Sequence, residues 1–294
     1  KTQIKKMIEW AVYMAHPDGN ISFFNDSTFE ISSNLKDIIK YAVNLKIINN
    51  KDILELWKRK NARFYLNHFK NTGYIVSSFN DAYLIADVGM VGPDYIPSHA
   101  HADTLSFELS IFGSRVIVNS GISTYEDNET RKYERGTSAH NTVVVEDKNS
   151  SEVWSSFRVG NRARAKVLKT AEKSSRISVK SQHDGYNSIM QKKIHSREWV
   201  LKKNSLLIYD KIIGKQKTNG QSILILHPNI KIVSFNNDSY ILEDKNNKKI
   251  VIDILKGISK NNETFYSLQF GKREKTKCIS IDLMNNESKI SISW

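Results

Sequence analysis

His99, His101 and Asp103 occupy alternate positions in the segment 97–103, and one alanine separates each from the next. Alternate side chains of an extended backbone leave the same face, so the two imidazoles and the carboxylate would stand side by side. An imidazole can accept or donate a proton near neutral pH, and it also binds zinc. The spacing therefore indicates either acid–base chemistry or a metal site.

The same His-x-His-x-Asp spacing is compatible with a metallohydrolase that holds a pair of zinc or iron ions. Two features of the sequence count against that alternative. Thr104 stands where such motifs carry a further histidine, and the chain lacks the alternating strands and helices of those folds. We keep the metallohydrolase as a minor alternative.

Further polar and aromatic residues follow between positions 119 and 164. Arg131 and Arg135 lie four positions apart and could present guanidinium groups to carboxylates or sulfates, although charges at a sheet edge have the same spacing. His140 directly precedes an apolar segment, a position that is more typical of a cap or turn. Trp154, followed by Phe157 and three arginines, suits the face of a sugar with an acidic substituent, but it is equally typical of a core residue.

The elements that must position these residues change in kind along the chain. Apolar residues recur every three or four positions over 1–15, 33–43 and 51–66, which predicts three helices. From residue 73 on, short segments with alternating apolar and polar residues predict antiparallel strands without intervening helices, at 74–79, 83–87, 106–112, 115–119, 142–145, 177–180, 206–209 and 223–227. We therefore expect a mainly β protein, with a large antiparallel β-sandwich over 71–294 and a helical segment over 1–70.

The composition narrows the classes of partner. The 294 residues carry a formal net charge of +13, which favours nucleic acids or acidic polysaccharides as partners, or simply a solubilising surface. The lysines are scattered rather than gathered in a stripe, so only the net charge supports nucleic-acid binding, and we expect none. No apolar run reaches the ~18 residues of a membrane span, and the lone Cys278 excludes a disulfide within the chain.

An ordered series of motifs in this sequence resembles the β-sandwich half of the heparinase II/III-like polysaccharide lyases. It begins with SHAHADTLSFEL at 98–109 and continues with NSG at 119–121 and RGTSAHNTVVV at 135–145. WSSFRV at 154–159, HDGY at 183–186 and HP at 227–228 extend the likeness. The segment 7–24, with PDG at 17–19, is similar to the last helices of the family's (α/α) toroid, so the helical segment would be the end of that toroid.

The resemblance implies a reaction and roles for three residues. These lyases cleave uronic-acid polysaccharides by β-elimination, in which a base removes the proton at C5 and an acid protonates the leaving glycosidic oxygen. His99 matches the histidine that lines the family's active cleft, so we expect it to be catalytic, and we assign Tyr125 and Arg135 to substrate binding. The expected partner is an acidic polysaccharide, and the expected location is periplasmic or secreted.

His101 and His140 fall where the family places two ligands of a structural metal, usually zinc, and Asn119 falls where it places a third ligand, an aspartate. A neutral amide oxygen is a poor substitute for a carboxylate in a zinc site. We therefore expect zinc to bind weakly or not at all. Asp103 would restore a carboxylate only if the backbone turned it toward the site.

The family's catalytic tyrosine, and the residue that neutralises the substrate carboxylate, lie in the toroid upstream of the residues present here. The chain begins at Lys1 rather than at a methionine, so we expect a processed or truncated product whose toroid is missing. A cleft built from two domains cannot assemble from one. The chain alone should therefore be inactive even if its parent is a lyase. The alternative is a carbohydrate-binding or scaffold module that has kept the fold and lost the chemistry.

Overall fold

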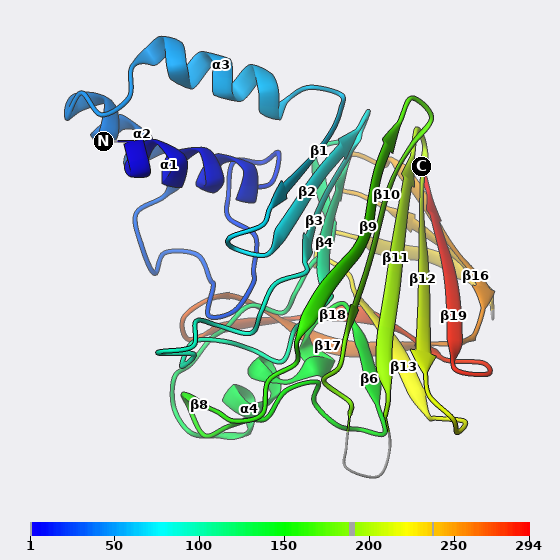
Figure 1. Cartoon of the computed structure of the whole chain (residues 1–294). Coiled ribbons are helices and arrows are strands. Elements are labelled where there is room, and N and C mark those ends of the chain that lie inside the picture. Colours follow the sequence, from blue (N-terminus) through cyan, green and yellow to red (C-terminus); the bar gives the residue numbers. More distant parts are fainter. Residues whose placement is uncertain (1, 188–191, 237) are drawn as a thin grey trace.

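The computed structural model describes residues 2–187, 192–236 and 238–294, and it stacks a helical layer and two large antiparallel sheets (Figure 1). The helical layer contains α1 (Thr2–Met14), α2 (Leu35–Asn44) and α3 (Asn50–Lys60). Asn34 and Asn49 cap α2 and α3, because each side-chain oxygen accepts a hydrogen bond from the backbone N–H three residues further on. None of the described helices is long and apolar enough to cross a bilayer.

Lys60 joins the end of α3 to the end of α1. Its Nζ donates to the carbonyl oxygens of Val12, in the last turn of α1, and of Ala15 and His16, which follow the helix, at 2.8, 2.6 and 3.3 Å. The side chain is buried, and this burial lowers the pKa of Lys60 to about 7.

The strands form three main sheets and one small hairpin, and every strand pair is antiparallel. The five-stranded sheet has the order β1 (Phe64–Phe69), β2 (Tyr74–Phe79), β3 (Ala82–Asp87), β4 (Phe107–Ile111), β5 (Ser114–Ile117). The eight-stranded sheet has the order β14 (Lys231–Phe235), β15 (Ser239–Glu243), β16 (Lys249–Lys256), β19 (Glu287–Ser293), β12 (Ser205–Ile213), β11 (Ile194–Lys202), β10 (Arg176–His183), β9 (Ala165–Lys173). The four-stranded sheet has the order β17 (Ile258–Gln269), β18 (Lys272–Asp282), β13 (Gly220–Ile225), β6 (Val143–Val145), and the hairpin joins β7 (Val153–Trp154) to β8 (Arg158–Val159).

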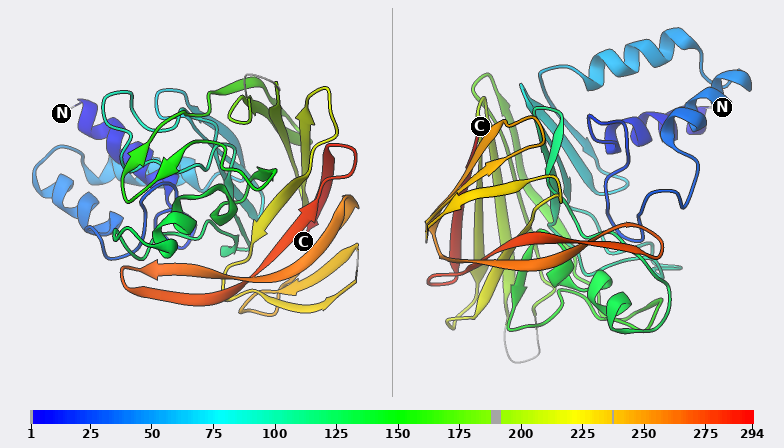
Figure 2. Two further views of the ribbon diagram at one scale, coloured as in Figure 1. Left: turned by 90° about the horizontal axis from the view of Figure 1, so that it is seen from below. Right: turned by 180° about the vertical axis from the view of Figure 1, so that it is seen from behind.

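The five-stranded sheet is buried on both faces. Along β3, Leu84 contributes to the core shared with the eight-stranded sheet, whereas its neighbours Tyr83 and Ile85 contribute to the cluster under the helices. This alternation follows from the two-residue period of a strand. The β17–β18 hairpin crosses the lower end of the sandwich (Figure 2). Near its end, the Ser267 and Leu268 carbonyls accept hydrogen bonds from Thr28 Oγ1 and Phe29 N at 3.2 Å each.

The mainly β architecture confirms the predicted fold class, and the three N-terminal helices lie where the periodicity predicts them. The third predicted helix, over 51–66, is too long, because Asn61 caps α3 and the aromatic-rich segment after it forms β1. Strand β1 therefore lies on the helical side of the predicted boundary at residue 70. The expectation that helices end before residue 73 is also wrong, since α4 (Glu129–Arg135) and the 3₁₀ turn η1 (Thr137–Ala139) lie between β5 and β6.

Candidate functional site

Asp26 lies at the centre of a cluster that the connections between strands bring together. His99 Nδ1 lies 2.8 Å from its Oδ2, and His101 Nε2 lies 2.8 Å from its Oδ1. Arg131, on α4, forms a two-pronged ion pair with the same carboxylate, in which Nη2 is 2.8 Å from Oδ2. One buried carboxylate thus holds two histidines from the segment 97–103 and an arginine from α4.

The charge on Asp26 fixes how the histidine rings are protonated. Burial would raise its pKa, but hydrogen bonds from His101 and Arg131 and the charge of Arg131 together hold the pKa well below its usual range. An ionised carboxylate only accepts hydrogen bonds, so the imidazole nitrogens that face it carry the hydrogens. In a neutral His99 ring, the lone pair therefore lies on Nε2. Because 64% of the His99 side chain is exposed, a ligand can reach this nitrogen.

Aromatic rings surround His99 and Arg131. The ring centroids of Tyr125 and Phe157 lie 6.0 and 5.5 Å from that of His99, and 5.1 Å from each other. The guanidinium carbon of Arg131 lies 5.0 Å from the Tyr125 ring and 5.4 Å from the Phe157 ring. Burial and the charge of Asp26 raise the pKa of Tyr125, so its hydroxyl stays protonated. The arrangement places an exposed imidazole beside an aromatic wall formed by Tyr125 and Phe157.

His101 and His140 lie side by side beneath this surface, with His101 Nδ1 3.2 Å from His140 Nε2. Both rings are buried, and burial together with the neighbouring His101 keeps the pKa of His140 well below its ordinary value. Asn119 Oδ1 accepts hydrogen bonds from Asn141 N at 3.1 Å and Asn141 Nδ2 at 3.3 Å. Asn119 Nδ2 and His140 Nδ1 are buried without a hydrogen-bond partner among the described atoms.

These contacts do not fit a zinc site. The oxygen of Asn119 that would bind the metal is occupied by Asn141, and both nitrogens of His101 are engaged by His140 and Asp26. Over residues 2–187, 192–236 and 238–294, no three histidine, cysteine or acidic side chains are grouped as metal ligands. Zinc needs three or four free donors that converge on one point. Weak or absent zinc binding stays a prediction.

Arg135 and Asp103 are both buried. The guanidinium of Arg135 donates to backbone carbonyls, among them those of Ala100 and Ser155 at 3.1 Å each, so it holds loops in place. Its assignment to substrate binding stays a prediction. Asp103 Oδ2 accepts a hydrogen bond from Asn25 N at 3.4 Å, and burial raises the pKa of Asp103. The carboxylate beside the histidines is Asp26.

His99, His101, Tyr125 and His140 are all singled out by the sequence, and the structure brings these four residues together. Asp26 lies more than 70 positions before the histidines, belongs to no motif and is not identified from the sequence. The left-handed backbone of Asn25, with φ of 55°, turns the chain at this point, and Asn25 Oδ1 accepts a hydrogen bond from His101 N at 3.3 Å. Asparagine is one of the few residues that adopt this conformation readily, so Asn25-Asp26 was the available signal.

Comparisons with known proteins concern the fold that carries this cluster. Residues 61–294 match the family model described as "Heparinase II/III-like, C-terminal". Among solved structures, the chain is similar to heparan sulfate lyase HepC from Pedobacter heparinus, with a TM-score of 0.78 and 16% identity over 99% of this chain and 46% of that one. Two heparinase III structures match with TM-scores of 0.77 and 0.72 and identities of 18% and 19%, over 98% of this chain and 45% and 47% of theirs. No curated protein sequence matches the chain. These identities show a shared fold, and the chain spans less than half the length of these structures.

Proposed function

We propose that this chain, which belongs to the heparinase II/III-like family, is the C-terminal part of a polysaccharide lyase that cleaves uronic-acid-containing polysaccharide by β-elimination. The observation that carries the proposal is the exposed His99 ring, whose Nδ1 is held by the buried Asp26 carboxylate. The proposed location, outside the cytoplasm in the periplasm or secreted, rests on the same family membership.

In the proposed reaction, His99 Nε2 accepts the proton from C5 of the uronate. The electrons of that C–H bond form a double bond between C4 and C5 as the C4–O bond breaks, and the glycosidic oxygen leaves with a proton from an acid. The ionised Asp26 supports this role, because it orients the ring and stabilises the imidazolium that forms. The Tyr125 and Phe157 rings offer an apolar surface next to the base, where a sugar ring can rest.

We also propose that the chain is inactive without an upstream toroid that supplies the acid and the group that neutralises the substrate carboxylate. The coverage of less than half of the solved lyase structures is consistent with such a missing domain. The test is the ultraviolet absorbance of the unsaturated uronate product. We expect none from the 294-residue chain with heparan sulfate, and sustained product formation by this chain would overturn the proposal.

The role of His99 is tested by His99→Ala in the full-length parent enzyme. We expect turnover to disappear while the thermal unfolding temperature stays nearly unchanged, because most of the side chain is exposed. His68→Ala is the matched control, since His68 is a half-buried histidine on β1 outside the cluster, and we expect it to leave turnover intact. Normal turnover by the His99→Ala enzyme would remove the base from the proposed mechanism.

One observation favours a second candidate, a carbohydrate-binding or scaffold module without lyase chemistry. Asn119 stands where the family is expected to carry an aspartate, and its oxygen is tied to Asn141. A module that no longer needs a catalytic cleft would tolerate this change. The two candidates are separated by the upstream sequence, because a toroid with its tyrosine indicates the enzyme.

A further inference from the structure

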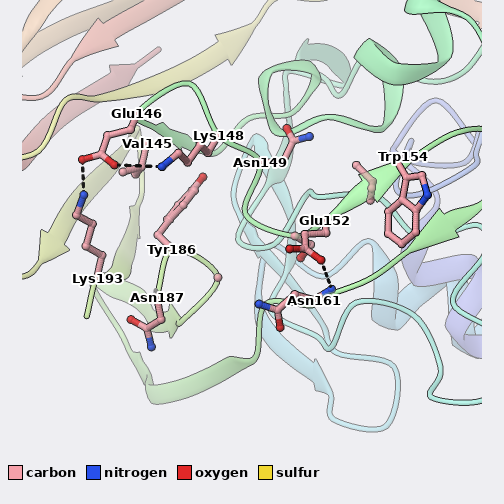
Figure 3. Close-up of a pocket in the computed structure, with 13 residues that line it drawn as sticks. Val145, Glu146, Lys148, Asn149, Glu152, Trp154, Asn161, Tyr186, Asn187 and Lys193 are labelled. Atoms are coloured by element: carbon pink, nitrogen blue, oxygen red, sulfur yellow. Dashed lines mark hydrogen bonds and ion pairs between the residues drawn. The ribbon is translucent and has the colours of Figure 1, made fainter. Parts of the chain in front are cut away.

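A pocket lies beside the β7–β8 hairpin. It has a volume of about 690 Å³ and lies between Trp154 and Glu152 on one side and Tyr186 and Lys193 on the other (Figure 3). None of the residues discussed above as base, aromatic wall or metal ligands lines it. It is therefore a different place from the histidine cluster.

Trp154 presents a fixed aromatic surface in this pocket. Half of the residue is exposed, which is unusual for the largest apolar side chain. The ring rests directly on the backbone at Gly160, because a Cβ atom built there would lie 2.9 Å from Trp154 Cζ3. The hairpin is held by Gly160 N donating to the Glu152 carbonyl at 2.8 Å and by Arg135 Nη1 donating to the Trp154 carbonyl at 3.3 Å. The indole is thus backed on one side and accessible on the other.

Polar groups with fixed positions border the ring. Glu152 Oε2 accepts from Asn161 N at 2.9 Å, which orients the carboxylate at the pocket edge. Asn149 Oδ1 accepts from Thr137 N at 2.9 Å, so its amide nitrogen is the part that can donate to a ligand. The side chains of Asn161 and Asn187 add two more amides to the lining.

The formal charges of the lining cancel, although the whole chain is strongly basic. Two lysines, Lys148 and Lys193, face two glutamates, Glu146 and Glu152. Lys193 forms an ion pair with Glu146, and Lys148 Nζ lies 3.8 Å from the same carboxylate. The pocket therefore offers an aromatic face and amide hydrogen bonds, without a surplus of positive charge for sulfates.

We infer that the Trp154 pocket is a second carbohydrate-binding site, which holds a pyranose residue by its apolar face and its hydroxyl or acetamido groups. The inference rests on the proposed function for the nature of the polymer. The C–H groups on one face of a pyranose ring suit an indole surface, and the equatorial oxygens reach the surrounding amides. Phe157, three residues after Trp154, contacts His99, so one hairpin borders both sites.

The experiment measures binding of an unsulfated hexasaccharide of alternating glucuronate and N-acetylglucosamine to the 294-residue chain, by calorimetry and tryptophan fluorescence. We expect Trp154→Ala to weaken binding about tenfold or more, and Trp154→Phe to retain part of the affinity. Phe235→Ala is the matched control: Phe235 is 60% exposed on β14, at the opposite edge of the eight-stranded sheet from β9, and should not change binding. Because the lining has no net charge, raising the salt concentration from 0.05 to 0.5 M should change the affinity less than about threefold.

Equal affinity for the Trp154→Ala chain and the unaltered chain overturns the inference, as does a failure of the unaltered chain to bind at millimolar hexasaccharide. A steep loss of affinity with salt also overturns it, because it would show recognition by charge. His99→Ala should leave binding at this pocket intact. If the parent enzyme requires His99 for turnover but the Trp154→Ala variant binds the hexasaccharide normally, only the second site is refuted. If the parent enzyme turns over without His99, the proposed mechanism is refuted, and the binding data alone decide on the second site.

Discussion

Replacing Asp26 with asparagine should destabilise the chain by about 3 kcal/mol. The substitution keeps the shape of the side chain but removes the charge that the Arg131 guanidinium faces, and both side chains are almost fully buried. Breaking a buried ion pair by removing one partner costs about 3–5 kcal/mol, because the remaining charge stays buried without compensation.

We expect a cost at the lower end of this range of about 3–5 kcal/mol, because Arg131 keeps its other contacts in the variant. The Ser156 carbonyl still accepts from its Nε at 3.0 Å and Nη2 at 2.9 Å, and the Tyr125 and Phe157 rings still flank the guanidinium. With an unfolding entropy of about 2.1 cal/mol/K per residue, about 3 kcal/mol lowers the melting temperature of a chain of this length by about 5 °C.

The assay is urea unfolding followed by circular dichroism, with the slope of the transition compared between variants. Asp18→Asn is the matched control. Asp18 pairs with Arg115 at 2.8 Å, but 34% of its side chain is exposed and Arg115 keeps the Asn20 and Ile21 carbonyls as partners, so we expect a loss of about 1 kcal/mol.

A double variant, Asp26→Asn with Arg131→Met, removes both the carboxylate and the buried positive charge that would otherwise be left without a partner. Its destabilisation should be smaller than the sum of the two single effects by at least about 1.5 kcal/mol. If Asp26→Asn changes the free energy of unfolding by less than about 0.5 kcal/mol, or if the two effects simply add, the carboxylate does not hold this cluster together and the reasoning fails.

Two further predictions concern Lys60 and Asn119. Because burial lowers the pKa of Lys60 from 10.5 to about 7, the unfolded chain binds an additional proton between these values, and stability should rise with pH across that window by at most about 1.4 kcal/mol per unit. Lys60→Met, measured by urea unfolding at pH 7 and pH 9, should remove this rise and cost about 2 kcal/mol at pH 9; an unchanged slope would show that a group other than Lys60 causes the rise. Elemental analysis after dialysis should find less than one zinc per chain in the unaltered protein and more in Asn119→Asp, and full zinc content without the substitution would contradict the contacts of Asn119.

The sequence predicts most of the fold because its pattern is local and regular. The alternation in 74–79 coincides with β2, and the periodicity in 33–43 lies within one or two residues of α2. The seven-residue helix α4 is missed because it is too short to show an apolar period, although Asn128 caps it by accepting from Arg131 N at 2.9 Å. The asparagine followed by an acidic residue was the signal available for it.

Only those residues of the site that lie in recognisable motifs can be predicted from the sequence. His99, His101 and His140 lie in segments whose residue types stand out, whereas Asp26 is one acidic residue among 31 and gains its role only from where the chain folds. Arg131 and Arg135 look alike in the sequence. Both are buried, and only their partners separate their roles, since one binds a carboxylate and the other binds carbonyls. No local pattern in the sequence records which partner a buried guanidinium finds.

The hydrogen bonds that tie residues 28 and 29 to the end of β17 link positions almost 240 residues apart. Contacts of such long sequence separation form late, because a large loop must close before they are made. During synthesis from the N-terminus, the loop that carries Asp26 cannot form these hydrogen bonds until nearly the whole polypeptide has been made. We therefore expect the histidines to acquire their fixed orientation only in the last stage of folding, so that a nascent or shortened protein would have the strands without an ordered base.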